Sequence, residues 1–262
     1  MDRKCDCKCA PMTMCMPCMP VMPCCCGNGG GGEPDPGRYV THGGGYELIV
    51  ATDGDDATAD GTEALPFATI EGAIAEVEKR SRLITSETKI RFKPGVYTTS
   101  STYLLQGIFG DGLWLESFSG ARDVSILYNG PGDIGEYMFR ISGLLCGFVN
   151  LTLGGQDTAH RIGTVICTAT GGCVPVRNCV VQHARLGLYS YGLIYTDGTQ
   201  ISNTADAAVL ARCGGVVSSR NSGGGSNTGI GLYADGGMIY KSGTQPSATT
   251  AEQKVHGGQI FG

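Results

Sequence analysis

The chain has 262 residues, of which 43 are glycine and 11 are proline, and 41% of its residues are hydrophobic. So much glycine without a collagen period, in a chain this apolar, excludes a collagen-like or disordered protein and predicts short strands with tight turns. The net charge of −5 arises from 19 basic and 24 acidic residues. Because this balance gives no basic stripe, we expect no nucleic-acid partner.

Three regions follow one another along the chain. Residues 1–26 are almost entirely Cys, Met and Pro with a few charges, and residues 27–46 form a glycine-rich linker. Residues 47–262 have the sequence of a globular β domain. No run of about 18 apolar residues occurs, so we expect no membrane insertion. The first residues do not resemble a secretory signal, which predicts synthesis and folding in a cytoplasm.

Eight of the 13 cysteines lie within the first region. Their spacing matches no zinc-finger or ferredoxin pattern. Their thiolates nevertheless suit zinc, copper or an iron–sulfur cluster. Cross-links between chains and simple packing remain open as alternatives. We therefore expect an assembly anchor whose candidate metal ligands or cross-linking residues are Cys5, Cys7, Cys9, Cys15, Cys18, Cys24, Cys25 and Cys26.

The other five cysteines are scattered through apolar or turn sequence. This placement predicts small buried side chains rather than ligands or disulfide partners. These five are Cys146, Cys167, Cys173, Cys179 and Cys213.

The stretch from Asp53 to Val77 predicts a turn followed by a short helix. Its first half holds glycines among Asp and Thr and ends at Pro66, which is typical of turns. Its second half carries apolar residues at helical spacing, and we expect a helix over about Ala68–Arg82. The apolar face of this helix consists of Ile70, Ala73, Ile74 and Val77.

Three acidic residues at the start of this stretch, Asp53, Asp55 and Asp56, have a spacing suggestive of calcium. They lack the later Glu and the fixed Gly of an EF-hand loop. We therefore interpret them as a polar turn before the helix.

After the helix, the hydrophobic period changes from helical to alternating. Lys89–Lys93 alternates strictly and is followed by a Pro-Gly turn, so Ile90–Tyr97 is the expected first rung of a solenoid. Further runs recur roughly 15–28 residues apart, a spacing that favours roughly six to eight solenoid rungs over hairpins. These runs are Val124–Tyr128, Val149–Leu153, Val174–Val181, Thr199–Ser202, Val216–Ser219 and Met238–Tyr240.

Four of the runs place an asparagine at or beside the strand edge. In a parallel β-helix such asparagines can stack at equivalent turns, although asparagine is also simply common in turns. The candidates for this ladder are Asn150, Asn178, Asn203 and Asn221.

The entry to the β domain resembles that of pectate-lyase-like β-helix proteins, which combine a "GT…PF-TI-AI" helix with an "I-F-PG-Y" rung. The matching residues are Gly61-Thr62, Pro66-Phe67, Thr69-Ile70, Ala73-Ile74, Ile90, Phe92, Pro94-Gly95 and Tyr97. The resemblance implies an all-β fold, a right-handed single-stranded parallel β-helix with an N-terminal capping α-helix. Here that fold is preceded by the irregular Cys/Met/Pro-rich tail.

The stretch Gly229–Phe261 is similar to the ends of bacteriophage tail-fibre and tailspike β-helices, in its "GG-I", "G-TQPS-T" and "GG-IF" elements. This resemblance implies a virion appendage that is a homotrimer. We accordingly expect a structural role: the N-terminus anchors to other virion proteins of the tail tip, baseplate or capsid, and the β-helix binds a host-surface glycan or receptor. The expected location is the virion, after synthesis in the host cytoplasm.

A polysaccharide lyase or glycoside hydrolase on the same scaffold is the alternative function. Glycosidases need two carboxylates at short range, and the closest candidates, Asp197 and Asp206, are interpreted as turn residues. A lyase needs acidic clusters beside a basic residue, and we see none beside Arg185, Arg212 or Arg220. No residue is assigned a catalytic or cofactor-binding role. The lack of paired or clustered carboxylates favours a protein that is not an enzyme.

Overall fold

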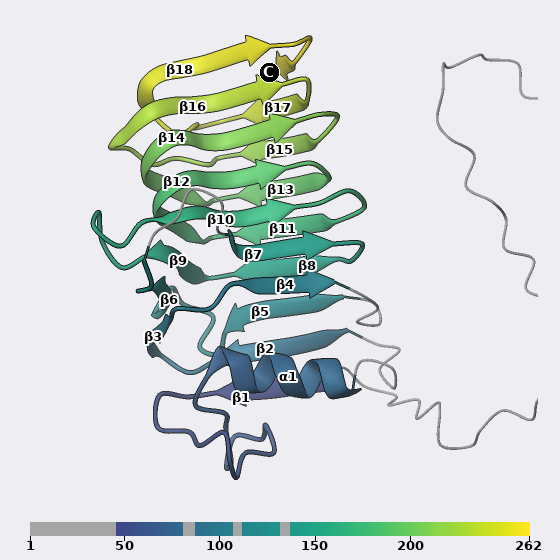
Figure 1. Ribbon diagram of the computed structural model, residues 1–262, viewed down its shortest axis with the longest axis vertical. Coiled ribbons are helices and arrows are strands. Elements are labelled where there is room, and N and C mark those ends of the chain that lie inside the picture. Colours follow the sequence, from purple (N-terminus) through teal and green to yellow (C-terminus); the bar gives the residue numbers. More distant parts are fainter. Residues whose placement is uncertain (1–45, 81–86, 107–111, 132–136) are drawn as a thin grey trace, which may run out of the picture. The chain divides into compact units, whose positions relative to one another are not determined.

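The structure is a computed structural model that describes residues 46–80, 87–106, 112–131 and 137–262. These residues form a parallel β-helix of about seven turns with one short helix near its N-terminal end (Figure 1). Parallel crossovers of this kind wind right-handed in nearly all folds. The predicted fold class and the predicted number of rungs are therefore confirmed.

Sheet A runs along one side of the coil and takes one strand from each turn. Neighbouring strands pair in parallel, so each turn lies directly beside the next. Within the described residues its strands are β1 (Tyr46–Val50), β2 (Thr88–Phe92), β5 (Leu113–Ser117), β8 (Cys146–Val149), β11 (Cys173–Arg177), β13 (Leu193–Asp197), β15 (Val216–Arg220), β17 (Met238–Ser242) and β19 (Gln259–Phe261).

Sheet B covers the remaining sides of the coil, because its longer strands bend around a corner. Strand β12 pairs with β9 through its first residues and with β10 through its last residues. The bend falls at His183, whose φ of 50° is a left-handed value. In the described ranges sheet B contains β3 (Gly95–Thr99), β4 (Tyr103–Gln106), β6 (Val124–Tyr128), β7 (Tyr137–Ser142), β9 (Leu151–Gly155), β10 (Ile162–Thr168), β12 (Val180–Ser190), β14 (Gln200–Arg212), β16 (Asn227–Asp235) and β18 (Ala248–Val255).

The hydrophobic core lies inside the coil and is built by strand alternation. Strands β2, β5 and β6 bury every second side chain, as the strand period of two predicts. Equivalent residues of successive turns stack on one another: Ile90 lies beside Leu115, and Leu115 beside Phe148. All three are fully buried. Such columns of packed apolar side chains supply most of the stability of a solenoid.

Helix α1 (Ile70–Arg80) covers the N-terminal end of the coil (Figure 1). Its predicted apolar face is buried in the core, which confirms the predicted capping role. The helix begins at an N-cap, because Thr69 Oγ1 accepts a hydrogen bond from Gly72 N at 3.0 Å. The predicted helix was longer at both ends, and its last two residues, 81 and 82, lie outside the described ranges.

The coil begins before the helix rather than after it. Strand β1 pairs with β2 over its whole length, from Tyr46 beside Thr88 to Val50 beside Phe92. The predicted first rung is therefore preceded by another strand. The alternation signal is missing from β1 because its last three residues are all buried. For this reason the sequence pattern did not reveal it as a strand.

The asparagines predicted to form a ladder share one corner of the coil, with the exception of Asn203. Asn150, Asn178 and Asn221 all have positive φ and occupy the same corner, directly after strands of sheet A. Asn203 lies within β14 instead, at the bend of sheet B. In one turn, Gly198 occupies this corner in place of an asparagine. A Cβ at Gly198 would lie 2.5 Å from Asn178 Oδ1. The asparagine side chain therefore fills the space beside a glycine of the next turn.

Two predicted strand runs are each divided by this corner. The run Val149–Leu153 spans the end of β8 and the start of β9, and Val174–Val181 spans β11 and β12. Val124–Tyr128 matches β6 residue for residue. The sequence pattern did not predict strand β10, because all seven of its residues are buried and no alternation of apolar and polar residues marks it.

The N-terminal segments, residues 1–26 and nearly all of 27–46, lie outside the described residues. The division of the chain into anchor, linker and β-helix therefore stays a prediction. In the described part of the chain, no helix has the length and apolar character needed to cross a membrane.

Candidate functional site

The predicted N-terminal metal or cross-link site is not described. All eight of its cysteines, from Cys5 to Cys26, lie outside the described residues. In the ranges that are described, no three His, Cys, Asp or Glu side chains gather closely enough to hold a metal ion. The site and its metal remain predictions.

The five cysteines of the coil carry free thiols. Cys146, Cys167 and Cys179 are buried as predicted, whereas Cys173 is half-buried and Cys213 is exposed. Burial raises the pKa of the Cys167 and Cys179 thiols to about 12, and it raises the pKa of Cys146 as well. These three thiols are therefore inert side chains of the core. The burial prediction is wrong for Cys213, which lies at a corner between β14 and β15.

The acidic turn before α1 serves local structure. Asp55 accepts hydrogen bonds from Ala57 N and Thr58 Oγ1, both at 3.0 Å. Asp56 Oδ1 accepts hydrogen bonds from Ala68 N at 2.7 Å and Thr69 N at 3.1 Å. Because these carboxylates bind the turn and the helix N-terminus, the interpretation as a polar turn agrees with the structure.

The outer face of sheet A carries a column of exposed aromatic side chains, which we call the aromatic column (Tyr195, Tyr240 and Phe261). Tyr195 lies beside Ser218, Ser218 beside Tyr240, and Tyr240 beside Phe261. The three aromatic side chains are 43–46% exposed. The rings of Tyr240 and Phe261 are stacked at 5.1 Å. Exposed aromatic groups on one flat face are typical of a recognition surface.

The single tryptophan of the chain lies on the same face. Trp114 is paired with Gly147 of the next turn, and a Cβ at Gly147 would lie 2.2 Å from the indole ring. The indole therefore lies flat over the glycine backbone. The guanidinium of Arg177 lies 5.7 Å from the centre of the indole, within cation–π range.

A second column on this face is charged; we call it the charged column (Arg177, Asp197 and Arg220). Arg177 lies beside Asp197, and Asp197 beside Arg220. Arg220 Nε is 3.9 Å from Asp197 Oδ1, and the two side chains are 67% and 54% exposed. A pair this exposed stabilises the fold by about 0–1 kcal/mol at most. These charges therefore remain available to a ligand.

A groove of about 450 Å³ lies on this face. Its volume is within the range of about 300–1,000 Å³ that is usual for small-molecule sites. It combines an aromatic side chain with three charges, a mixture that fits a polar ligand with an apolar face. The groove is lined by Cys173, Pro175, Arg177, Tyr195, Thr196, Asp197, Ser218 and Arg220.

The two carboxylates considered for catalysis lie on different sheets. Asp197 ends β13 of sheet A, and Asp206 lies in β14 of sheet B, where its Oδ2 is 2.6 Å from Arg185. Both belong to strands, so the interpretation as turn residues is wrong. Glu116 shares the outer face of sheet A with Asp197 but lies three turns away. At about 4.8 Å per turn this is roughly 14 Å, beyond the spacing of glycosidase carboxylates.

The three arginines singled out in the sequence each lie beside an aspartate of a neighbouring turn. Arg185 pairs with Asp206, and Arg212 Nε lies 3.0 Å from Asp235 Oδ2. Arg220 pairs with Asp197. The sequence did not reveal these partners, because they lie about one coil length away along the chain.

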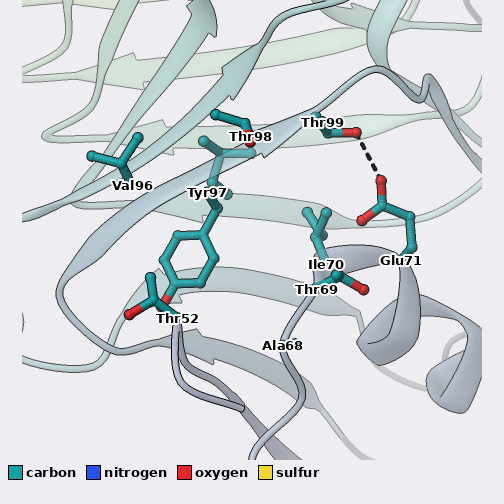
Figure 2. A pocket seen from close by; sticks show the side chains of 10 residues that line it. Thr52, Ala68, Thr69, Ile70, Glu71, Val96, Tyr97, Thr98 and Thr99 are labelled. Carbon is teal, nitrogen blue, oxygen red and sulfur yellow. Dashed lines mark hydrogen bonds between the residues drawn. The ribbon is translucent and has the colours of Figure 1, made fainter. Parts of the chain in front are cut away.

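A smaller cavity of about 230 Å³ lies where the first turn of α1 meets β3 (Figure 2). Glu71 Oε1 accepts hydrogen bonds from Thr99 Oγ1 at 2.7 Å and Tyr103 Oη at 2.8 Å. Burial raises the pKa of Tyr103, so its hydroxyl remains a donor at neutral pH. Burial, together with the charge of Asp53, raises the pKa of Tyr97 in the cavity wall to about 12. These hydrogen bonds hold the helix against the first turns of the coil.

The histidines lie apart from both cavities. His160 Nδ1 is 3.0 Å from Asp157 Oδ1, and His256 Nδ1 is 2.6 Å from Asp235 Oδ1. His183 lies at the bend of β12, and burial lowers its pKa. His42 lies outside the described residues. None of the three described histidines is among the residues that line either cavity.

The fold and this face together define a parallel β-helix protein whose sheet A carries exposed aromatic and charged side chains on its outer face. No protein-family model matches the chain, and no curated protein matches it. Among solved structures, YbhC of Escherichia coli is similar over 81% of this chain and 70% of that chain, with a TM-score of 0.49 and 14% identity.

Two pectin methylesterases are similar at the same level. The Aspergillus niger enzyme has a TM-score of 0.44 and 16% identity over 79% of this chain and 60% of that chain. PemA from Erwinia chrysanthemi has a TM-score of 0.43 and 13% identity over 76% of this chain and 67% of that chain. Similarities this distant concern only the fold of the chain and give no information about its functional site.

Proposed function

We propose that this protein is a β-helix appendage of a virus particle that binds a glycan or receptor of the host surface through the outer face of sheet A. The observation that carries the proposal is the groove on that face, which brings Tyr195 together with the charged column. No enzyme activity is part of this proposal.

A glycan suits this face for a chemical reason. A sugar ring has one face of C–H groups and a rim of hydroxyl groups. The C–H face packs on an exposed aromatic ring such as Tyr195, while the hydroxyls exchange hydrogen bonds with Arg177 and Asp197. The aromatic column continues over several turns to Phe261. An extended chain of sugars is therefore a better match than a single compact ligand.

The remaining parts of the proposal rest on the sequence. Residues 1–26 anchor the protein to other virion proteins, residues 27–46 act as a hinge, and three chains associate into a homotrimer. The order of anchor, linker and coil supports this arrangement, as does the resemblance of Gly229–Phe261 to phage fibre ends. One part of that resemblance has a structural purpose here: Gln245 of the TQPS turn accepts a hydrogen bond from Ser219 Oγ at 2.7 Å.

A second candidate function is an enzyme that acts on a polysaccharide. The observation that favours it is the single carboxylate of Asp197 in the groove, with Arg177 and Arg220 beside it. A carboxylate flanked by two guanidinium groups can act as a nucleophile or a base. The large separation of Asp197 from Glu116 argues against a glycosidase pair made of these two residues.

One experiment separates the two functions. The full chain is incubated with immobilised bacterial capsular and exopolysaccharides and with methyl-esterified pectin, and both binding and release of reducing ends, unsaturated uronates and methanol are recorded. The appendage proposal expects saturable binding without release of products. Turnover by the wild-type chain that disappears in Asp197→Asn would establish the enzyme instead.

The anchor and the trimer need separate tests. Elemental analysis of the purified full chain is expected to detect zinc, copper or iron if the N-terminal cysteines bind metal, and its absence would leave cross-linking or packing. Light scattering of residues 47–262 is expected to give the mass of a trimer. A stable monomer would contradict a trimer held together by the β-helix itself.

A further inference from the structure

The cavity beside helix α1 contains a carboxylate oxygen to which no described neighbour donates a hydrogen bond. Both hydrogen bonds that Glu71 accepts go to Oε1, from Thr99 and Tyr103. Its Oε2 accepts none from the described residues. Figure 2 shows the second oxygen turned away from Thr99. Glu71 is half-buried and lines the cavity, which brings its carboxylate within reach of a donor that enters the cavity.

The walls of the cavity add unused hydroxyl groups and an apolar surface (Figure 2). The hydroxyls of Thr52 and Thr98 form no hydrogen bond with other described residues, and both side chains are exposed. Val96 also lines the cavity and is 60% exposed. The cavity wall therefore combines hydroxyl groups with an exposed apolar side chain, which is the composition of a small polar ligand site.

The charges around the cavity favour a cation. Glu71 lines the cavity, and the charge of Asp53 is felt by Tyr97 in its wall. The nearby ammonium of Lys93 is turned to the carbonyl of Glu63, 3.3 Å away. The cavity therefore has a carboxylate with a free oxygen and no ammonium group among its lining residues.

We propose that this cavity binds one amino-sugar residue, whose ammonium group pairs with Glu71 Oε2 while its hydroxyls bond to Thr52 and Thr98 and its ring packs on Val96. The volume of about 230 Å³ is below the range of about 300–1,000 Å³ that is usual for small-molecule sites, so a single sugar ring suits it better than an oligosaccharide. This site lies apart from the groove on sheet A and goes beyond the proposed function.

Saturation-transfer NMR on the full chain tests this site at pH 6, where the amine is protonated. The probes are glucosamine, glucose and N-acetylglucosamine, and fully deacetylated chitotriose distinguishes a chain end from a free monosaccharide. Glucosamine is expected to bind at about millimolar affinity, and the two neutral sugars at least about tenfold more weakly, because they lack the charged donor. Equal binding of glucose and glucosamine would overturn the proposal.

Two variants assign the binding to this cavity. Glu71→Gln keeps an acceptor for Thr99 and Tyr103 but removes the charge, and it is expected to weaken glucosamine binding about tenfold. Val96→Trp fills the cavity without touching that network and is expected to abolish binding. Leu104→Trp, at a similarly exposed position of β4, is the matched control and should bind as the wild type does.

The outcome is independent of the groove on sheet A. Tyr195→Ala is expected to leave glucosamine binding unchanged, whatever it does to binding of a host glycan. If Val96→Trp binds glucosamine as well as Leu104→Trp does, or if Glu71→Gln binds as well as the wild type, the sugar does not occupy this cavity and the inference is wrong.

Discussion

Lys241 and Glu252 form an ion pair in the mouth of the last described turn. Lys241 occupies the same inward-facing position of its turn as Thr196 and Ser219 do in the two turns before it. Glu252 lies beside the buried Leu232. The open end of a solenoid exposes its core and free strand edges, and inward charges protect such an end from pairing with another chain. The paired charges make this mouth polar.

Replacing this pair by apolar residues is expected to promote association through the mouth. Lys241→Met combined with Glu252→Leu should form larger species than the wild type as concentration rises, because the mouth becomes an apolar surface. Sedimentation velocity measures the change. The control is Arg185→Gln with Asp206→Asn, which removes a pair on sheet B that is 38% and 45% exposed. The same distribution of species in both double variants would refute a protective role of the pair.

The buried Asn227 joins neighbouring turns through its carboxamide. Oδ1 accepts hydrogen bonds from Thr204 N at 3.0 Å and Thr204 Oγ1 at 2.8 Å, and Nδ2 donates to Ile201 O at 3.1 Å and Ser247 O at 2.9 Å. Asn227→Ala leaves these groups without partners and is expected to lower the free energy of unfolding by about 2–4 kcal/mol. Urea denaturation measures the loss.

Asn203→Gly is the control for this variant. Asn203 has a φ of 56°, which glycine adopts without strain, so its loss is expected to change the free energy of unfolding by less than about 1 kcal/mol. A similar loss of stability in both variants would show that the buried hydrogen bonds of Asn227 are not the cause.

Trp114 reports on the outer face of sheet A, because it is the only tryptophan of the chain. Gly147→Ala places a methyl group where the indole lies and is expected to displace the ring into solvent. Its fluorescence emission should shift to longer wavelength. Gly223→Ala is the matched control, since its Cβ would meet only Thr244 at an ordinary 3.5 Å. An unchanged emission maximum in Gly147→Ala would contradict the flat packing of the indole.

The core thiols are expected to resist alkylation over a wide pH range. Burial raises the pKa of Cys167 and Cys179 to about 12, so both stay protonated and unreactive as the pH rises from 7 to 10. The exposed Cys213 should react in the folded protein. Peptide mapping after iodoacetamide treatment, with and without denaturant, measures each site. Rapid modification of Cys167 or Cys179 in the folded chain would contradict their burial.

The sequence revealed the parts of the fold that depend on local chemistry. The capping helix was predictable because Ile70, Ala73, Ile74 and Val77 follow the helical period within a few residues. Strand β6 was predictable because one of its sides faces the core and the other faces outward. Strands β1 and β10 were not, because consecutive buried residues leave no alternation to read.

The arrangement of side chains on the outer face of sheet A was not predictable from the sequence. Tyr195 and Tyr240 belong to one column only because β13, β15 and β17 pair in register. That register depends on the lengths of the intervening coils, which are irregular. For the same reason, the aspartate partner of each arginine was not predictable from the sequence. Alternation within β13 and β17 placed the tyrosines on the outside, but the pattern alone does not say which outer residues become neighbours.

The proposed binding of a glycan at the groove of sheet A is tested most directly with the polysaccharide that the wild type binds best, by comparing the affinities of Tyr195→Ala and Leu104→Ala for it. The two side chains are 46% and 48% exposed, and only Tyr195 lines the groove. Loss of the tyrosine is expected to weaken binding at least about tenfold, while Leu104→Ala should bind as the wild type does. Equal affinities of the two variants would contradict a glycan site on this face.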